Sequence, residues 1–334
     1  MKTLALCVRV SFCICFLISL KAYGYKDYRT PVSSNFQPKL KTSIKISAFN
    51  IQIFGRSKSQ KPEVMKQLVK ILNRSDINFI QEIRDKSGSA LRSLWAQTNQ
   101  ANAHKFALIQ SEPLGRTSSK EQYAYMYNDN LVQVLEYAVY PDPYDVFERE
   151  PFMALWKSRS GEEFITIGLH AKPSDVDREL AALNDVVEYA QYRWANHSVL
   201  IMGDLNADCD YYNEDEGFSH IAADIESWIL DHEDTTVGAT NCSYDRFLST
   251  GSLGEHIKEV EVFNFERVYK LSHEFSKQIS DHYPIELTLD FGMAFQATDD
   301  SGKQCLQNSY QTPLDYCFGF KGKVKRRVPG YCCF

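Results

Sequence analysis

The sequence predicts an α/β protein of the α+β type, in which two mixed β-sheets pack as a sandwich flanked by helices. Short apolar segments of strand character both alternate with helical segments and follow one another directly, which argues against a Rossmann fold. A chain of 334 residues can bury one large domain of roughly 250 residues and still leave two terminal segments. Polar side chains recur where the expected strands begin or end.

The first expected strand covers residues 44–49, where apolar and polar side chains alternate. Pro62 opens an expected helix, because Pro suits a first helical position and the apolar residues after it recur at helical spacing. The next strand covers 76–82 and completes a β-α-β beginning. Further strands are expected at 123–127, 153–156, 164–169, 198–202, 260–263 and 283–289, with a long helix at 175–194.

The first 24 residues have the pattern of a secretory signal peptide. Lys2 precedes an apolar stretch at 10–20, and small residues at Ala22 and Gly24 suit a signal peptidase. A membrane anchor is the alternative, but the stretch is shorter than the ~20 residues that span a bilayer. We therefore expect a secreted, extracellular protein, with a polar lead-in at 25–42 and a folded domain at 43–291.

Residues 292–334 form a cysteine-containing tail of different character. It is polar and ends in a basic run, which is either a solvated tail or a contact for a polyanion or a membrane surface. The basic residues are Lys321, Lys323, Lys325, Arg326 and Arg327.

Cysteine usage agrees with export. Three of the nine cysteines lie in the signal peptide, and an even number in the mature chain favours disulfides. Cys209 and Cys242 are the only two in the folded domain, so they are expected to pair. Asn73 and Asn196 lie in glycan acceptor triplets.

The formal charge of −6 excludes a protein that holds nucleic acid by bulk charge alone. Removal of the first 24 residues, which carry three basic residues and no acidic ones, would make it −9. An enzyme that meets a polyanion through a local basic patch and a metal remains compatible with this balance.

Oxygen donors and histidines gather at the expected strand ends. Carboxylate and amide oxygens suit a hard divalent cation, which can stabilise the charge that grows on a phosphate under attack. Histidine suits proton transfer near neutral pH, and a neighbouring carboxylate fixes its tautomer. Each residue alone has an ordinary structural explanation, but their joint position at strand ends favours metal-assisted chemistry on a phosphate. The oxygen donors are Asn50, Glu82, Asp204, Asn206 and Asp281, and the histidines are His170 and His282.

Five segments make the chain resemble the deoxyribonuclease I family. Gly203-Asp204-Leu205-Asn206 and Ser280-Asp281-His282-Tyr283-Pro284 mark only the wider superfamily of metal-dependent phosphodiesterases. The five segments are 46–55, 79–85, 111–121, 147–151 and 242–246, which match in order over about residues 43–291. Among them, Ser111-Glu112-Pro113-Leu114-Gly115-Arg116 and Cys242-Ser243-Tyr244-Asp245-Arg246 narrow the resemblance to this family. The resemblance implies the endonuclease/exonuclease/phosphatase-type fold and makes 43–291 a catalytic domain.

The resemblance also implies roles for individual residues. Glu121 with His170, and Asp245 with His282, match the family's two carboxylate–histidine pairs. The oxygen donors named above match its Mg²⁺ or Mn²⁺ and phosphate shell, and Cys209 and Cys242 match its structural disulfide. Structural Ca²⁺ is implied at Asp234, Thr236 and Thr240 and at Asp142, Asp145 and Glu150, although such loops often serve only as turns. DNA contacts are implied for Arg84, Arg116, Arg149 and Tyr244, with surface ion pairs as the alternative for the arginines.

Two departures from the pancreatic type concern its partners. Ser119 replaces a tyrosine that stacks in the minor groove, and Leu108 and Gln110 replace the residues that contact actin. Actin binding is therefore expected to be weak, which favours the gamma-type, actin-resistant branch. The four tail cysteines do not belong to that branch's pattern.

The resulting expectation is a secreted endonuclease that cuts double-stranded DNA with little sequence preference and leaves 5′-phosphate ends. A monomer is expected. The alternatives are a related phosphodiesterase that acts on phospholipid or inositol phosphate, and a catalytically silent binding or toxin protein on the same scaffold. Retention of Glu121, His170, Asp245 and His282 weighs against the silent protein.

Overall fold

The structure is a computed structural model. It describes residues 42–102, 105–213, 217–229 and 232–292, together with three short strands in the tail. The expected signal peptide, nearly all of the lead-in and the basic run of the tail lie outside the described residues. Within the described part, no helix has the length and apolar character needed to cross a bilayer.

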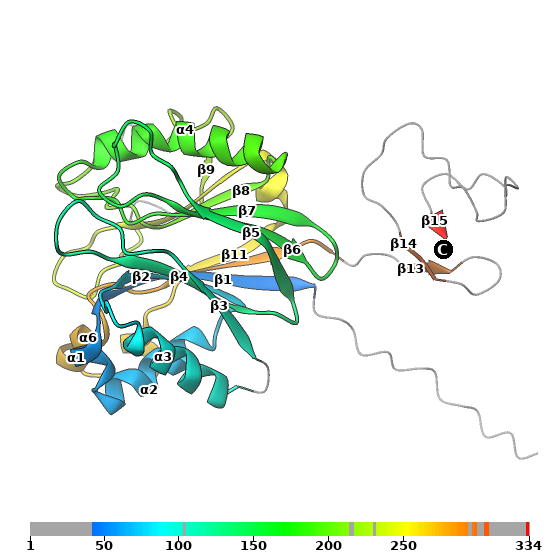
Figure 1. The fold of residues 1–334 in the computed structure, drawn as a ribbon. Helices are drawn as coiled ribbons and strands as arrows, with labels where there is room; N and C mark the ends of the chain where they lie inside the picture. Colours follow the sequence, from blue (N-terminus) through cyan, green and yellow to red (C-terminus); the bar gives the residue numbers. More distant parts are fainter. Residues whose placement is uncertain are drawn as a thin grey trace, which may run out of the picture. The chain divides into compact units, whose positions relative to one another are not determined.

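The first sheet has six strands in the order β11-β12-β1-β2-β4-β3 (Figure 1). Only β1 and β2 pair in parallel, and the other neighbours are antiparallel. The strands are β1 (Ser43–Phe54), β2 (Ile77–Ile83), β3 (Phe106–Gln110), β4 (Gln122–Asn128), β11 (Ile257–Val262) and β12 (Ile285–Asp290).

The second sheet also has six strands, in the order β5-β6-β7-β8-β10-β9. Here β7 and β8 form the one parallel pair. The strands are β5 (Val132–Val139), β6 (Phe152–Ser158), β7 (Glu163–Gly168), β8 (Val199–Asp204), β9 (Glu226–Ser227) and β10 (Asp245–Thr250). Two mixed sheets with flanking helices confirm the predicted fold class.

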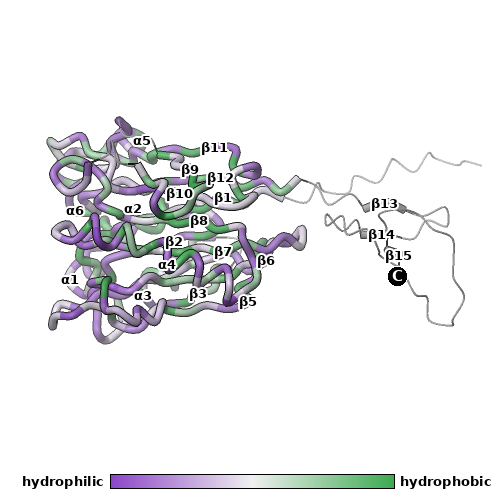
Figure 2. The backbone as a smooth tube through the Cα atoms, turned by 90° about the horizontal axis from the view of Figure 1, so that it is seen from above, coloured by the Kyte–Doolittle hydropathy of each residue, from purple (hydrophilic) through white to green (hydrophobic). Residues whose placement is uncertain are grey.

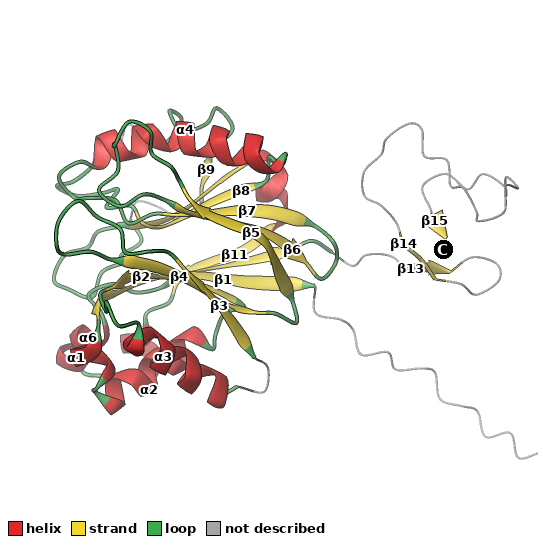
Figure 3. Ribbon diagram, in the orientation of Figure 1, coloured by secondary structure: helices red, strands yellow, loops and turns green. Residues whose placement is uncertain are grey.

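Helices cover both outer faces of the sandwich (Figure 3). Helix α4 (Val176–Trp194) packs on the second sheet, and the first sheet carries most of the others. The helices on the first sheet are α1 (Arg56–Ser59), α2 (Pro62–Leu72), α3 (Ser89–Gln100), α5 (Phe265–Tyr269) and α6 (His273–Ile279); a 3-10 helix, η2 (Gly251–His256), follows β10.

Three apolar clusters hold these layers together. One lies between the sheets and two lie between a sheet and its helices, so the central strands are apolar on both faces. Figure 2 shows hydrophobic residues along these strands. Aromatic rings fill the space between the sheets; the ring centroids of Tyr125 and Trp156 are 5.4 Å apart. A Cβ added to Gly168 would lie 2.2 Å from the Phe79 ring, so this close packing requires glycine.

The strands and helices expected from the sequence are present, and several others were missed. The helix that Pro62 opens ends at Leu72, and its apolar face is buried as the spacing predicted. β5 gave no clear signal because much of it is exposed, and β10 was obscured by Arg246, which is fully buried within the strand. In the tail, β13 (Gln296–Thr298), β14 (Gln304–Leu306) and β15 (Cys332–Cys333) pair as a small antiparallel sheet.

Candidate active site

The site lies at one edge of the sandwich, where strand ends from both sheets meet. The carboxyl ends of β1, β2, β7 and β8 point to this edge because each sheet contributes one parallel pair. Antiparallel neighbours bring their starts to the same place: Asp245 opens β10 opposite Asp204, and Ile285 of β12 lies opposite Ala48. Glu121 likewise precedes β4, whose Gln122 lies opposite Ile83. The topology therefore gathers residues that are far apart in the sequence.

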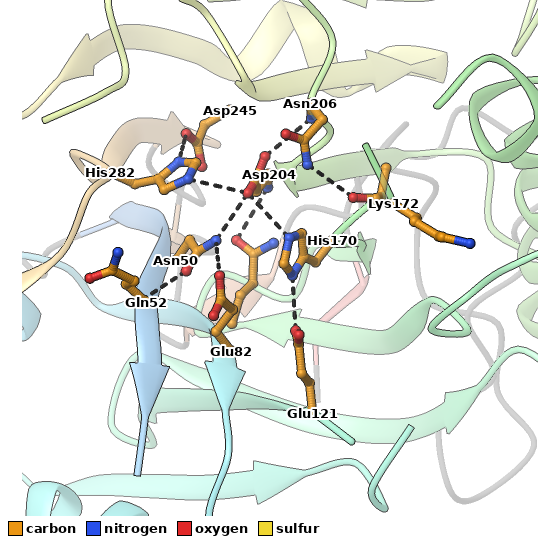
Figure 4. Close-up of polar contacts among 12 residues, drawn as sticks. Asn50, Gln52, Glu82, Glu121, His170, Lys172, Asp204, Asn206, Asp245 and His282 are labelled. Atoms are coloured by element: carbon orange, nitrogen blue, oxygen red, sulfur yellow. Dashed lines mark hydrogen bonds and ion pairs between the residues drawn. The ribbon is translucent and has the colours of Figure 1, made fainter. Parts of the chain in front are cut away.

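His170 and Glu121 form the first carboxylate–histidine pair (Figure 4). The Nδ1 of His170 lies 3.0 Å from Oε2 of Glu121, and both side chains are buried. The backbone of His170 is fixed as well, because its N–H donates to the Tyr123 hydroxyl (2.9 Å) and its carbonyl accepts from Arg149 (3.0 and 3.1 Å). The other oxygen of Glu121 accepts from Arg84 (2.6 Å) and Arg149 (3.3 Å).

His282 and Asp245 form the second pair, and their ring nitrogen and carboxylate oxygen are 2.7 Å apart. Ser280 supports this loop: its hydroxyl donates to the Asn50 carbonyl (2.6 Å) and accepts from the His282 N–H (3.1 Å). Thr235 holds the carboxylate side, because its hydroxyl accepts from the Asp245 N–H at 3.2 Å. Each histidine thus has one ring nitrogen engaged by a buried carboxylate.

The two free ring nitrogens converge on one atom. The Nε2 atoms of His170 and His282 each lie 3.4 Å from Oδ2 of Asp204, so they are within twice that distance of each other. Figure 4 shows Asp204 between the two rings. A phosphate beside Asp204 would therefore have a proton-transfer group on either side of it.

The charges at the site shift the pKa values of its groups. Burial favours the neutral form of Glu121, but the hydrogen bond and charge of His170, with Arg149 and Arg84, outweigh it and lower its pKa to about 2. Burial disfavours a charged His282 ring, but Asp245 and Asp204 outweigh this effect and raise its pKa to about 10. The Glu121 carboxylate and the His282 ring are therefore favoured in their charged forms.

Oxygen atoms beside this centre fit a hard divalent cation. Glu82 and Asp204 are brought together by the Asn50 amide, which donates to both carboxylates at 3.0 Å. Asp281 uses one oxygen to accept from Gln52 (2.7 Å), and its other oxygen is buried without a hydrogen-bond partner among the described residues, 4.0 Å from Nε2 of His282. Buried, unpaired carboxylate oxygens are costly unless a cation or water satisfies them. The donor set therefore suits a hard divalent cation.

The backbone beside these donors adopts unusual conformations. Gln52, Ile53, Glu82 and Asn206 all have positive φ, between 32° and 57°. The N–H of Ile53 donates to Glu82 at 2.8 Å, so the irregular end of β1 holds this carboxylate in place. Positive φ is unfavourable for residues with a side chain and is retained where the surrounding contacts impose it.

The structure brings together one of the two expected calcium loops. The Thr236 hydroxyl donates to Asp234 (2.7 Å) and lies close to the Thr240 carbonyl (2.9 Å). In the other loop, Asp142 accepts from the Phe147 N–H, and the exposed Asp145 accepts from Arg116. Among the described residues, no group of three convergent His, Cys, Asp or Glu side chains includes Asp142, Asp145 or Glu150, or Asp234 of the first loop.

The expected DNA-contacting residues lie on two sides of the centre. Arg84 and Arg149 contact Glu121, whereas Arg116 pairs with Asp145 on the loop before β6. The Tyr244 ring lies 6.3 Å from the His282 ring and packs on the half-exposed Tyr211. Cys209 and Cys242 form a disulfide with a Cα–Cα distance of 5.9 Å, which closes the loop that leads to Tyr244.

Sequence reasoning missed Glu179 in helix α4, which is fully buried behind the first pair. Its carboxylate accepts from the N–H groups of Glu148 (2.8 Å) and Lys172 (3.1 Å), so it ties together the segments that carry Arg149 and His170. The burial raises the pKa of Glu179 to about 7, against the two hydrogen bonds and the nearby Arg149 and His170. A lone glutamate on a predicted helix gives no sequence signal for this role.

Gln81, which the sequence analysis did not single out, connects the two sheets. Its amide donates to the Leu169 carbonyl (2.9 Å) and its oxygen accepts from the Asp204 N–H (3.2 Å). This fully buried side chain therefore holds the ends of β7 and β8 against the end of β2.

The family model and the individual relatives that match this chain agree with each other. The model of the Endonuclease/Exonuclease/phosphatase family matches residues 47–330. Deoxyribonuclease-1 of Gallus gallus is 37% identical over 264 residues, which cover 75% of this chain and 94% of that protein. Deoxyribonuclease-1 of Homo sapiens is 38% identical over 261 residues, covering 74% and 92%. Deoxyribonuclease-1-like 2 of Mus musculus is 35% identical over 257 residues, covering 74% and 92%.

Solved structures of distant relatives share the fold. An endonuclease/exonuclease/phosphatase family protein from Bacteroides thetaiotaomicron has a TM-score of 0.55 at 15% identity, covering 75% of this chain and 99% of that one. The human Nocturnin catalytic domain has a TM-score of 0.53 at 16% identity, covering 76% and 96%. At these identities the likeness concerns the arrangement of strands and helices alone.

Proposed function

The chain belongs to the deoxyribonuclease I family, and from this we propose a secreted, divalent-metal-dependent endonuclease that cuts double-stranded DNA with little sequence preference. Membership of the family makes it a DNA-hydrolysing enzyme. The metal, the product ends and the secretion belong to the proposal. The observation that supports the proposal most directly is the convergence of His170 and His282 on Asp204 at 3.4 Å, each held by its own buried carboxylate.

Hydrolysis needs a base for the attacking water and an acid for the leaving oxygen. We assign His282, held by Asp245, to remove the water's proton through Nε2. This role requires the neutral ring, which a divalent cation beside Asp204 would favour by offsetting part of the negative charge that raises the pKa of His282. We assign His170, held by Glu121, to protonate the departing 3′-oxygen, which leaves a 5′-phosphate. The two roles can be exchanged, because both rings present Nε2 to the same point.

Mg²⁺ or Mn²⁺ would be held by Glu82 and Asp281 with Asn50, Asp204 and Asn206 nearby, and when bound it would stabilise charge on the phosphoryl oxygens. Asn50 orients two of these carboxylates through its amide. Arg84 and Arg149 lie beside the same centre and would bind backbone phosphates. Structural Ca²⁺ would support the loop of Asp234, Thr236 and Thr240.

The remaining parts of the proposal concern the surface and the tail. Asn73 and Asn196 would carry glycans, and the basic tail would contact a polyanion or a membrane surface. Residues 1–24 would be removed on export. Gln110 would weaken an apolar contact with actin, so actin should inhibit the enzyme poorly. A monomer is proposed.

Plasmid nicking by the mature protein, in Mg²⁺ with Ca²⁺, tests this function. We expect nicking that EDTA, His170→Ala and His282→Ala each abolish. His273→Ala is the matched control, since this half-exposed histidine lies on α6 and pairs with Glu266 instead. DNA ligase should reseal the nicks without prior kinase treatment if the ends carry 5′-phosphates.

Two results would contradict the proposal. Full nicking by His170→Ala would remove His170 from the mechanism. Absence of nicking by folded protein that contains both metals would reject the nuclease and favour phospholipid or inositol phosphate as substrate.

A further inference from the structure

A groove of about 620 Å³ adjoins the candidate active site. One wall comes from the end of β1 and from α1, and the other from the loop after β2. The two walls are joined by a hydrogen bond, which the Arg84 N–H donates to the Phe54 carbonyl at 2.8 Å. They approach closely at Gly55, where an added Cβ would lie 2.7 Å from the Arg84 carbonyl. The groove is lined by Ile53, Gly55, Arg56, Ser57, Arg84, Asp85, Lys86 and Ser87.

Three of the lining residues are cationic and only Asp85 is acidic. The Asp85 carboxylate is buried and faces the start of α3, where it accepts from Ser87, Ser89 and the Ala90 N–H. These hydrogen bonds overcome the effect of burial and keep the pKa of Asp85 well below its usual range, so this charge is already engaged. The groove therefore retains a positive balance.

The cations of the groove have capacity for a ligand. Arg56 and Lys86 are exposed, and within the described residues neither side chain takes part in a hydrogen bond or an ion pair. The Nε of Arg84 is buried and has no hydrogen-bond partner among the described residues. Two exposed cations without acidic partners among the described residues thus face the groove, beside an Arg84 guanidinium whose Nη2 is already paired with Glu82 and Glu121.

Arg84 also connects the groove to the active centre. Its Nη2 lies 3.3 Å from Glu82 and 2.6 Å from Glu121, which are a proposed metal ligand and a catalytic carboxylate. In addition, Ile53 lines the groove and donates its N–H to Glu82. An extended polyanion with one phosphate at the centre would therefore place a neighbouring phosphate over this groove.

We propose that Arg56 and Lys86, together with Arg84, form a subsite for a backbone phosphate of DNA that flanks the scissile phosphate. This inference rests on the proposed function and adds Arg56 and Lys86 to it. Neither residue contacts the reacting atoms, so both contribute to substrate binding through charge. Their contribution does not depend on base identity, because phosphates carry no sequence information.

Binding of a short DNA duplex in EDTA, measured by fluorescence anisotropy over a range of salt concentrations, tests the subsite without cleavage. The variant Arg56→Gln/Lys86→Gln removes two cations. Each phosphate that loses its cationic contacts makes the slope of log affinity against log salt shallower by about one, so we expect a change of about one for this single-phosphate subsite. In cleavage assays the same loss should raise KM.

The matched control, Lys157→Gln/Lys258→Gln, removes the same charge at the opposite end of the sheets. Lys157 lies at the end of the sheets away from the groove, because it is paired with Glu163 at the start of β7. Lys258 lies at the same end, because its neighbour Ile257 is paired with Leu289 at the end of β12. An unchanged slope in the groove variant, or an equal change in the control, would overturn the subsite. Because binding is measured without turnover, this outcome is independent of whether plasmid nicking succeeds.

Discussion

Replacement of Glu179 by glutamine tests how a buried carboxylate supports the candidate active site. The side chain is fully buried and accepts two backbone N–H groups, from Glu148 and Lys172. Glutamine keeps the size but removes the charge, and its NH₂ group would face one of these N–H donors. The segments that position Arg149 and His170 would then lose one of the two hydrogen bonds that join them to Glu179.

The pKa of Glu179 sets the expected size of the effect on stability. It is raised from 4.5 to about 7, so the folded protein binds a proton that the unfolded chain has released. Its stabilising contribution is complete below about pH 4.5 and is lost as the pH rises through about 7. The loss amounts to about 3 kcal/mol, because a tenfold change in a protonation equilibrium corresponds to about 1.4 kcal/mol.

Urea unfolding of the wild type and Glu179→Gln across this pH range measures the effect. The free energy of unfolding of the wild type, relative to the variant, should fall by about 3 kcal/mol between about pH 4.5 and 8. Glu188→Gln is the matched control, since Glu188 is exposed on the same helix. A difference that stays constant with pH would refute the assignment of a raised pKa.

Activity should respond in the opposite direction. The ionised carboxylate can accept both N–H groups, whereas the protonated acid offers one of its oxygens as a donor. We therefore expect Glu179→Gln to lower kcat more than it raises KM, and to remove part of the activity gained between about pH 6 and 8 in the wild type. Equal kcat values for the variant and the wild type would show that the hydrogen bonds to Glu179 contribute to stability and not to catalysis.

Three further predictions concern the scaffold. Gly168→Ala should lower the melting temperature, because its Cβ would overlap the Phe79 ring and overpacking costs about 1–3 kcal/mol or more; an unchanged melting temperature would contradict the close packing. Joint replacement of Cys209 and Cys242 by serine should lower the free energy of unfolding in urea by roughly 3–4 kcal/mol, since the disulfide spans 33 residues; no loss would show that the loop needs no cross-link. Arg246→Met should lower the same quantity by at least about 2 kcal/mol, because the buried guanidinium donates to two backbone carbonyls; an unchanged value would contradict this.

The sequence alone was sufficient for the fold class and for selecting the oxygen donors and histidines of the candidate site. Strand periodicity and polar residues at strand ends are local properties, so they can be read without knowing which strands are neighbours. This is why Glu82, Asp204 and Asp281 could be selected as oxygen donors. The pairing of His170 with Glu121 came from the resemblance to a family, since nothing in the spacing of two residues 49 positions apart indicates a contact.

The tertiary structure decided which groups share hydrogen bonds and how deeply they are buried. Only the register of both sheets places Asp204 at 3.4 Å from two histidines, and only packing against α4 makes Glu179 a buried carboxylate with two backbone donors. The same packing turns Asp85 toward α3 and leaves Arg56 and Lys86 facing a groove. Hydrogen bonding and desolvation depend on neighbours that are distant in the chain, so a sequence pattern determines the residue types at a site and the fold determines their chemistry.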